Sequence, residues 1–268
     1  MHFGIREHAM GAVLNGLAVS KVRPFGAGFL IFSDYMKPPI RLSALMELPV
    51  IYVFTHDSIG LGQDGPTHQP VEQLIALRSI PGLITLRPAD ANEVVEAWRV
   101  VLALQHQPAC LVLTRQPVPT LDRTHFAPAS GVARGAYILA DAHDHKPSVI
   151  LIGTGSEVAL CAEAYESLTR EGIAARVVSM PSWELFEQQD QPYRDSVLPP
   201  EVTARVSVEQ ASVIGWDRYV GTDGAKIGMH TFGSSAPIKD LLKKFGFTPD
   251  KVAVAAKEQI AKSRRQKS

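Results

Sequence analysis

The sequence has little of what marks several specialised classes of protein. Its 268 residues include two cysteines, Cys110 and Cys161, and neither stands in a CxxC or Cys/His pattern. This scarcity argues against a disulfide framework, and we expect both thiols to be reduced core residues. No apolar run approaches the roughly 18 residues that cross a membrane. Because no apolar segment follows the charged N-terminus, as one does in a signal peptide, we expect a soluble cytoplasmic protein without a membrane partner.

The chain also lacks a net charge. Lys and Arg together number 27, and so do Asp and Glu, so no global field attracts nucleic acid or acidic membrane surfaces. The basic residues at 262–267 are of the kind that usually remains solvated, and we expect no nucleic-acid partner. Apolar residues make up 46% of the chain, which is enough for about two domains with buried cores.

The clearest pattern present is a series of short apolar runs of strand length. They lie at 48–54, 83–88, 109–114, 148–153, 174–180 and 204–209. Between the second and third runs, residues 91–104 have a helical spacing of apolar side chains, and Asp90 or Asn92 is placed to cap that helix. Strands that alternate with helices indicate βαβ units and parallel sheets.

Residues 117–136 interrupt this rhythm with three prolines and no periodicity. We therefore predict an α/β fold with two domains, each a mostly parallel sheet flanked by helices. The first domain is expected at 1–120, a linker at 121–136 and the second domain at 137–268. The turn at 153–157 lacks the third glycine of GxGxxG, and we interpret it as a capped strand-to-helix turn.

Two segments near the N-terminus carry side chains that suit a ligand as well as a core. Glu7 opens an amphipathic helix, where a carboxyl also stabilises the helix dipole by about 0.3–1 kcal/mol, so the residue alone does not establish a catalytic role. Phe29, Phe32 and Tyr35 follow one another at intervals of three, which places their rings on one face if the segment is helical. Such a face is either an aromatic core stripe or a wall for a flat ring.

The loop at 55–70 is the most informative segment. It directly follows the apolar run at 48–54 and is rich in His, Asp, Ser and Gly. In open parallel sheets, ligands bind outside the carboxyl ends of the strands, and so polar a loop there is typical of a binding site. The alternative is a capping turn before a helix near Val71. His56 and His68 have no partner at metal-ligand spacing, so we expect no metal site.

Arg115 occupies the corresponding place after the apolar run at 109–114. An arginine at the carboxyl end of a parallel strand lies at the ligand-binding edge of the sheet, and its guanidinium suits a phosphate or a carboxylate. A lone arginine is more often a surface residue, so this prediction depends on the neighbouring loop.

These segments resemble transketolase, a thiamine-diphosphate transferase, over essentially the whole chain. The most specific matches are at 3–10, 29–35 and 55–70, with further ones at 174–181 and 228–233. The resemblance implies the transfer of a two-carbon ketol unit from a ketose phosphate to an aldose phosphate in the pentose phosphate pathway. It also implies a homodimer or heteromer that uses thiamine diphosphate and Mg²⁺ or another divalent cation.

The resemblance further implies roles for single residues. Glu7 is similar to the glutamate that bonds N1′ of the cofactor's aminopyrimidine. The hydrophobic residues around that ring in the family are similar to Phe29, Phe32 and Tyr35. The residues similar to the family's substrate contacts are His56, Asp64, His68 and Arg115. The first two of these imply contacts to donor hydroxyls and the last two imply contacts to the sugar phosphate, while Glu7 and His56 are the expected catalytic residues.

The sequence departs from the family in what it lacks. It contains no Gly-Asp-Gly with a downstream Asn to bind the metal and diphosphate, and the first strand and helix of the family's pyrimidine-binding domain are missing before Glu7. We expect the first sheet to have an exposed edge. We also expect a separate N-terminal chain to bind the diphosphate and its cation, and the isolated chain to lack transketolase activity.

Other functions remain compatible with the sequence. One is that of a related thiamine-diphosphate enzyme, either a deoxyxylulose-phosphate synthase or the β subunit of a 2-oxo acid dehydrogenase, although His56 and Arg115 favour transketolase. Another is that of a non-catalytic interaction module, or of a fragment truncated at Met1. The donor that reacts, a ketose phosphate or pyruvate, distinguishes the enzymes.

Overall fold

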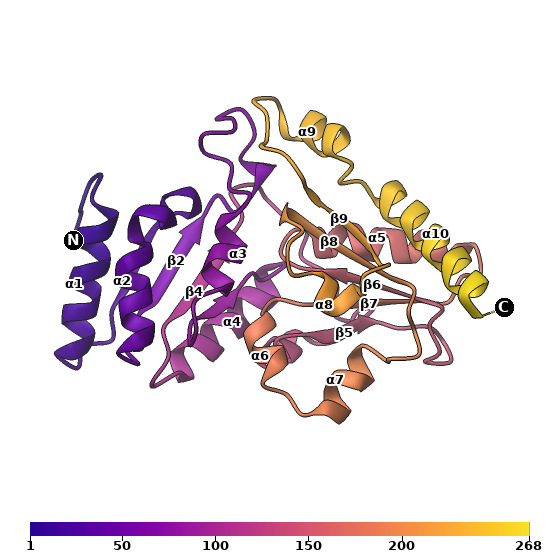
Figure 1. The fold of residues 1–268 in the computed structure, drawn as a ribbon, viewed down its shortest axis with the longest axis horizontal. Coiled ribbons are helices and arrows are strands. Elements are labelled where there is room, and N and C mark those ends of the chain that lie inside the picture. The colour runs from indigo at the N-terminus through magenta and orange to yellow at the C-terminus, as the bar shows by residue number, and fades with distance from the viewer. Residues whose placement is uncertain (268) are drawn as a thin grey trace.

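The first half of the chain folds around a four-stranded parallel sheet in the computed structural model, which describes residues 1–267 (Figure 1). In spatial order the strands are β1 (Phe25–Phe29), β2 (Ile51–Thr55), β4 (Ala109–Leu113) and β3 (Ile84–Leu86). The helices are α1 (Glu7–Val19), α2 (Ser33–Leu45), α3 (Gln73–Arg78) and α4 (Ala91–Ala103), with the 3-10 turns η1 (Leu30–Phe32) and η2 (Ile59–Leu61). Helices α1, α2 and α3 pack on one face of this sheet and α4 on the other.

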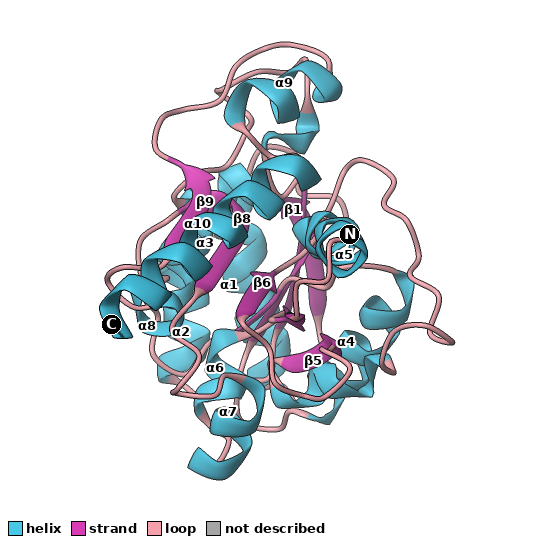
Figure 2. Ribbon diagram, turned by 90° about the vertical axis from the view of Figure 1, so that its right-hand side faces the viewer, coloured by secondary structure: helices cyan, strands magenta, loops and turns pink. Residues whose placement is uncertain are grey.

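The second half folds around a five-stranded sheet of mixed direction. In spatial order its strands are β5 (Tyr137–Ala140), β7 (Ala175–Ser179), β6 (Val149–Gly153), β8 (Arg205–Ser212) and β9 (Ala225–Met229), and only β5 is antiparallel to its neighbour. The helices are α5 (Glu157–Arg170), α6 (Trp183–Glu187), α7 (Gln191–Val197), α8 (Asp217–Val220), α9 (Ile238–Phe245) and α10 (Pro249–Lys267). Helices α5 and α10 pack on one face and α6, α7 and α8 on the other, while α9 lies at the top of the view in Figure 2.

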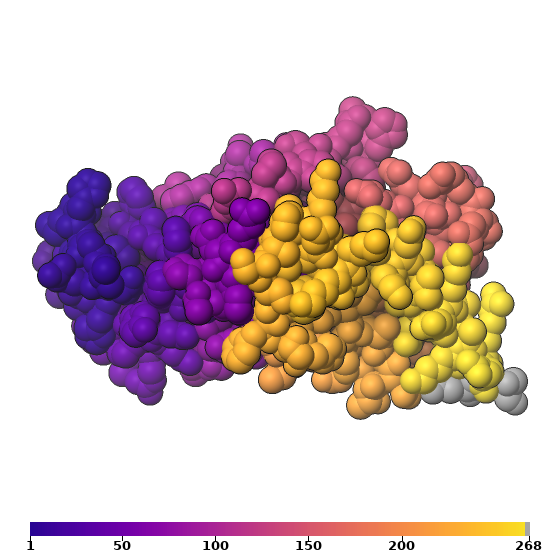
Figure 3. Space-filling view, turned by 90° about the horizontal axis from the view of Figure 1, so that it is seen from above, coloured from indigo at the N-terminus to yellow at the C-terminus, as the bar shows by residue number. Residues whose placement is uncertain are grey.

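The carboxyl ends of the two sheets meet at Arg87, which directly follows β3. Its backbone N–H donates to the carbonyl of Pro181 beyond β7 (2.8 Å), and its own carbonyl accepts from Gly155 N–H beyond β6 (3.0 Å). Beside this junction, Arg78 of α3 forms a two-bond ion pair with Glu209 of β8 (2.9 and 2.8 Å). The apolar cluster under α4 continues into the second domain, and the two halves abut in Figure 3.

The predicted fold class is confirmed, and each of the six strand-length runs contains a strand. Asp90 caps α4, because its carboxylate accepts from the N–H of Glu93 (2.9 Å), whereas Asn92 lies inside the helix. Both cysteines are buried and free. Strand β1 was not predicted, because its sequence, Phe-Gly-Ala-Gly-Phe, is glycine-rich and none of its residues is fully buried. The predicted linker at 121–136 contains the 3-10 turn η3 (Ala129–Arg134).

One edge of the first sheet is open. Among residues 1–267 strand β1 pairs with β2 alone, and the Phe25 side chain on it is 67% exposed. Helix α1 and β1 together line a hollow of about 590 Å³ whose walls include Val13, Leu17 and Phe25. An open edge beside apolar side chains is a surface that typically pairs with another chain. Among the described residues, no helix is both long and apolar enough to cross a membrane.

Candidate active site

A wall of aromatic rings stands at the carboxyl ends of β1 and β2. The rings of Phe29 and Phe32 stack at 6.3 Å between centroids with an interplanar angle of 8°, and Phe32 meets Tyr35 at 6.1 Å. The segment is not a single helix as its spacing suggested, because Phe29 ends β1, Phe32 lies in η1 and Tyr35 lies in α2. The change of element still leaves the rings side by side. Tyr35 remains 65% exposed, so one side of the wall is open.

Two loop histidines extend this wall. The ring of His56 lies 3.9 Å from that of Phe29, and the ring of His68 meets Phe32 edge-on at 5.6 Å. The Nδ1 atom of each histidine lies within hydrogen-bonding distance of the preceding threonine hydroxyl, at 2.9 Å for His56 and 3.0 Å for His68. A flat apolar surface with imidazoles at its rim suits a planar ring next to a polar substrate.

His56 sits in an unusual backbone and electrostatic environment. Its φ of 65° lies in the left-handed region, which costs most side chains about 1–2 kcal/mol. Burial lowers the pKa of its imidazole, and the nearby charge of Arg115 lowers that pKa further, while Asp64 and Asp57 oppose the shift. The site therefore favours a neutral imidazole that can accept or donate a proton in a hydrogen bond.

Asp64 and Arg115 are both exposed at this edge of the molecule. Arg115 follows β4 and is close enough for its charge to act on His56, as is Asp64. Within the described part of the chain, neither side chain has a hydrogen-bond partner. The structure thus gathers His56, Asp64, His68 and Arg115 around one end of the sheet, with unpaired charges available to a ligand.

Glu7 lines the hollow beside β1. It begins α1 and is half-buried, and that hollow is also lined by Gly28, the residue before Phe29. Within residues 1–267 its carboxylate has no hydrogen-bond or ion-pair partner. Helix α1 therefore holds an unpaired carboxylate at its first turn, a position in which the helix dipole favours the negative charge.

The described residues contain no group of three or more His, Cys, Asp or Glu side chains that could hold a metal ion.

The structure does reveal a buried group of charges behind the loop that the sequence did not point to, centred on Arg87 and Asp57. The predicted cap at 153–157 differs as well. Ser156 makes no side-chain capping bond to α5 and instead donates to Glu157, which belongs to this buried group. The Arg87–Asp57 pair joins residues thirty positions apart, so no local pattern signals it.

Two family models match the chain. The model described as "Transketolase, pyrimidine binding domain" matches residues 1–120, and the model described as "Transketolase-like TK C-terminal domain" matches residues 135–248. Curated relatives include transketolase from Aquifex aeolicus, which is 54% identical over 254 residues, and transketolase from Geobacillus stearothermophilus, which is 51% identical over 261 residues. These matches cover 94% and 97% of this chain but only 37% and 39% of the relatives.

Solved structures agree with the sequence matches. Transketolase from Leishmania mexicana superimposes with a TM-score of 0.91 at 44% identity, and the match covers 97% of this chain and 38% of that one. A structure titled "Split gene transketolase, inactive beta4 tetramer" gives a TM-score of 0.81 at 26% identity and covers 97% of this chain and 83% of that one. The chain therefore belongs to the transketolase family, a family of thiamine-diphosphate transferases, and corresponds to the C-terminal portion of its members.

Proposed function

We propose that this chain supplies the pyrimidine-side half of a transketolase active site and works in an assembly with a separate N-terminal chain. The reaction is the transfer of a two-carbon ketol unit from a ketose phosphate to an aldose phosphate. One observation carries the proposal: the aromatic wall, two histidines and two unpaired charges gather at the carboxyl ends of β1, β2 and β4. We also propose domain boundaries at residues 120 and 137.

The residues on the cofactor side fit the pyrimidine of thiamine diphosphate. Phe29, Phe32 and Tyr35 offer a partly open aromatic surface for a flat ring. Glu7 offers a half-buried carboxylate without a partner, which can accept or share a proton at a ring nitrogen. When bound, thiamine diphosphate supplies the electron sink that a ketol transfer needs. The diphosphate and its divalent cation are assigned to the N-terminal chain.

The loop residues fit a phosphorylated sugar. His56 and Asp64 are assigned to the donor hydroxyls, because a neutral imidazole and a free carboxylate both form hydrogen bonds to hydroxyl groups. His68 and Arg115 are assigned to the phosphate, since a guanidinium at a strand end binds phosphate oxygens with charge-assisted bonds. His56 is also the expected proton-transfer group beside the reacting carbon.

The share of the relatives' length that this chain spans motivates the partner. This chain spans less than two-fifths of the curated relatives that it matches, and the open edge of β1 with its apolar hollow is available for another chain. The split-gene structure, 83% of whose length is covered by this chain, bears the word "inactive" in its title. Both observations support an N-terminal partner chain that completes the active site, in a homodimer or heteromer.

The purified chain is expected to show no ketol transfer with thiamine diphosphate, Mg²⁺, xylulose 5-phosphate and ribose 5-phosphate. Adding the N-terminal portion of a transketolase should restore turnover. The measurement is the appearance of the longer ketose phosphate, followed by coupled assay or mass spectrometry. Phe25→Lys, which places a charge on the open edge of β1, is expected to weaken reconstitution. Full activity of the chain alone, or transfer from pyruvate in place of the ketose phosphate, contradicts the proposal.

Arg115→Gln is expected to raise the KM for phosphorylated donors about 10- to 100-fold, because a charge-assisted bond contributes about 1.5–3 kcal/mol. The kcat should change much less, since the contact acts on both ground and transition states. An unphosphorylated ketose serves as the matched control, and its KM should not rise. An equal rise in KM for the phosphorylated and the unphosphorylated donor would show that Arg115 does not bind the phosphate.

A further inference from the structure

The second domain contacts the back of the substrate loop, residues 56–69, directly and reaches its front through Arg87. We propose that this domain acts as a clamp that positions His56, Asp64 and His68, and that Arg87 and Gln69 are positioning residues of the site. The identity of the positioned groups rests on the proposed function, whereas the clamp itself can be tested without any reaction.

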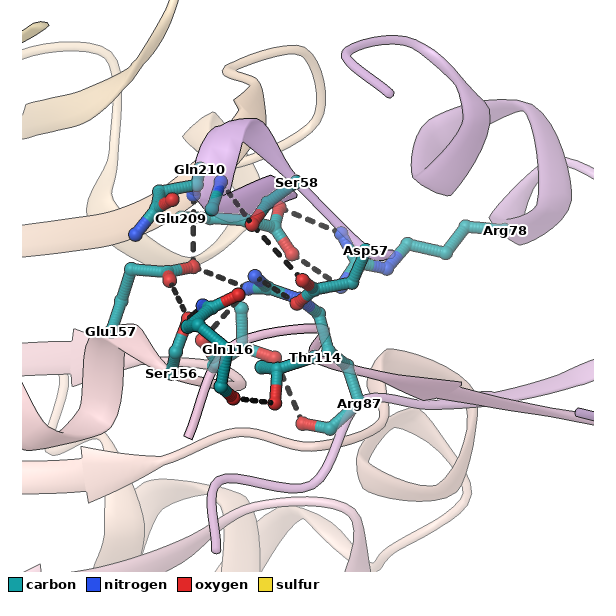
Figure 4. A network of polar contacts seen from close by, with 12 residues as sticks. Asp57, Ser58, Arg78, Arg87, Thr114, Gln116, Ser156, Glu157, Glu209 and Gln210 are labelled. Carbon is teal, nitrogen blue, oxygen red and sulfur yellow. Dashed lines mark hydrogen bonds and ion pairs between the residues drawn. The ribbon is translucent and has the colours of Figure 1, made fainter. Parts of the chain in front are cut away.

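The front of the loop is fixed by a buried ion pair, drawn in Figure 4. Asp57 follows His56 directly, and one of its carboxylate oxygens accepts from both Nε (3.0 Å) and Nη2 (2.7 Å) of Arg87. The other oxygen accepts from the hydroxyl of Ser58 (3.0 Å), which in turn accepts from Gly60 N–H (3.2 Å). Arg87 and Asp57 are almost fully buried, so bulk solvent does not compete for their hydrogen bonds.

The second domain holds the other side of the Arg87 guanidinium. The Nη1 atom of Arg87 donates to the carbonyl of Thr154 (2.8 Å) and to the carboxylate of Glu157, and Glu157 also accepts from Gln210 N–H (2.9 Å). A Cβ atom at Gly155 would lie 2.6 Å from the Arg87 guanidinium carbon. In other open α/β sheets, ligands bind beyond the carboxyl ends of the strands. In the second domain, the Arg87 side chain of the first domain occupies that place beyond β6.

This anchor explains the backbone of His56. A non-glycine residue in the left-handed region persists where its surroundings over-determine the conformation. Here β2 fixes Thr55 on one side through its pairing with β4, and Arg87 fixes Asp57 on the other. His56 lies between two fixed neighbours, so its imidazole is directed onto the ring of Phe29.

The back of the loop is fixed by the segment 233–235, which precedes α9. The side-chain nitrogen Nε2 of Gln69 donates to the carbonyl of Gly62 within the loop (2.8 Å) and to the carbonyl of Ser234 in the second domain (2.9 Å). Ser235 donates to the carbonyl of Gln63. A Cβ atom at Gly233 would lie only 1.7 Å from Oε1 of Gln69, so the two segments fit only because residue 233 has no side chain. Figure 1 shows the loop beside α9.

The test uses Gly233→Ala, Gln69→Ala and the double variant. The backbone of Gly233 does not have a positive φ, so alanine there acts through its contact with Gln69 rather than through backbone strain. Amide hydrogen exchange of the whole chain is measured by mass spectrometry. Each single variant is expected to raise exchange in peptides covering 57–69 by about tenfold. Peptides from α4 and β6 should be unchanged. Gly16→Ala, on an open helical site with no atom within 4 Å, is the control.

The double variant shows whether the effect passes through Gln69. In the Gln69→Ala background, Gly233→Ala is expected to add little, because the clashing amide is gone and the nearest remaining neighbour, Cγ2 of Ile59, lies at 3.2 Å. Unchanged exchange at 57–69 in both single variants overturns the clamp, and so does a full additional effect of Gly233→Ala in the double variant. Neither outcome depends on whether the assembly is a transketolase.

A titration of His56 by NMR tests the positioning. In the whole chain its imidazole pKa should lie below the usual range, owing to burial and Arg115, with the acidic residues 57 and 64 opposing and His68 adding to the shift. Gly233→Ala is expected to move that pKa towards its ordinary value. In a reconstituted assembly kcat should fall more than KM rises. An unchanged His56 pKa with increased loop exchange would overturn the part of the clamp in which the segment 233–235 positions His56.

Discussion

Replacing Glu7 with Gln is expected to reduce ketol transfer by the reconstituted assembly about 10²- to 10⁴-fold, the usual contribution of a positioned acid–base group. The carboxylate begins α1, is half-buried and has no hydrogen-bond or ion-pair partner among the described residues, so the helix dipole is the one structural interaction of its charge. Gln keeps the shape and the hydrogen-bonding ability of the side chain but cannot take up the proton. The loss should therefore appear in kcat rather than in KM for either sugar.

The control for this variant separates catalysis from helix stability. Loss of the charge at the first turn of α1 removes about 0.3–1 kcal/mol of dipole stabilisation, which shifts Tm by only a few degrees. Glu163→Gln, on the exposed side of α5 in the second domain, makes the same chemical change far from the site and should leave the rates unaltered. Near-normal turnover by Glu7→Gln would refute its assigned role.

The strands were predictable where burial requires a continuous run of apolar residues. Strand β2 is covered on both faces, with Tyr52 and Phe54 on one side and Ile51 on the other, so it is a continuous apolar run. Asp90 was identifiable as one of two candidate caps, with Asn92, because capping is a local interaction over three residues. The loop at 55–70 and Arg115 could be proposed as candidate site residues because polar residues there directly follow buried strands.

The rest depends on contacts that no local pattern encodes. Strand β1 has two glycines and an exposed edge, so it lacks the apolar signal of its neighbours. The aromatic wall is assembled from a strand, a 3-10 turn and a helix, and its helical spacing was coincidental. The pair of Gln69 and Ser234 joins residues 165 positions apart, and only the packed domains bring them together.

Arg87→Met is expected to destabilise the chain by about 3–5 kcal/mol, because the variant leaves two buried carboxylates without their cation. Burial disfavours the charge of Arg87, but Glu157 and Asp57 outweigh that cost and raise its pKa well above the usual range. At about 2–4 °C per kcal/mol for a protein of this size, the Tm should fall by about 6–20 °C. Arg99→Met removes a surface ion pair with Glu96 and should cost less than about 1 kcal/mol.

The pH dependence of Arg87→Met distinguishes the loss of charge pairing from a loss of packing. In the parent chain burial raises the pKa of the Glu157 carboxyl and Arg87 opposes that rise, so loss of the guanidinium raises this pKa further above its unfolded value. The folded variant then binds protons that the unfolded chain releases, so its stability rises as pH falls and is lost as pH rises through the raised pKa. The difference in Tm from the parent chain should therefore shrink between pH 7 and pH 5. A difference that stays constant over this range would mean that Arg87 joins the two sheets by filling space, and that the anchor of His56 does not depend on its charge.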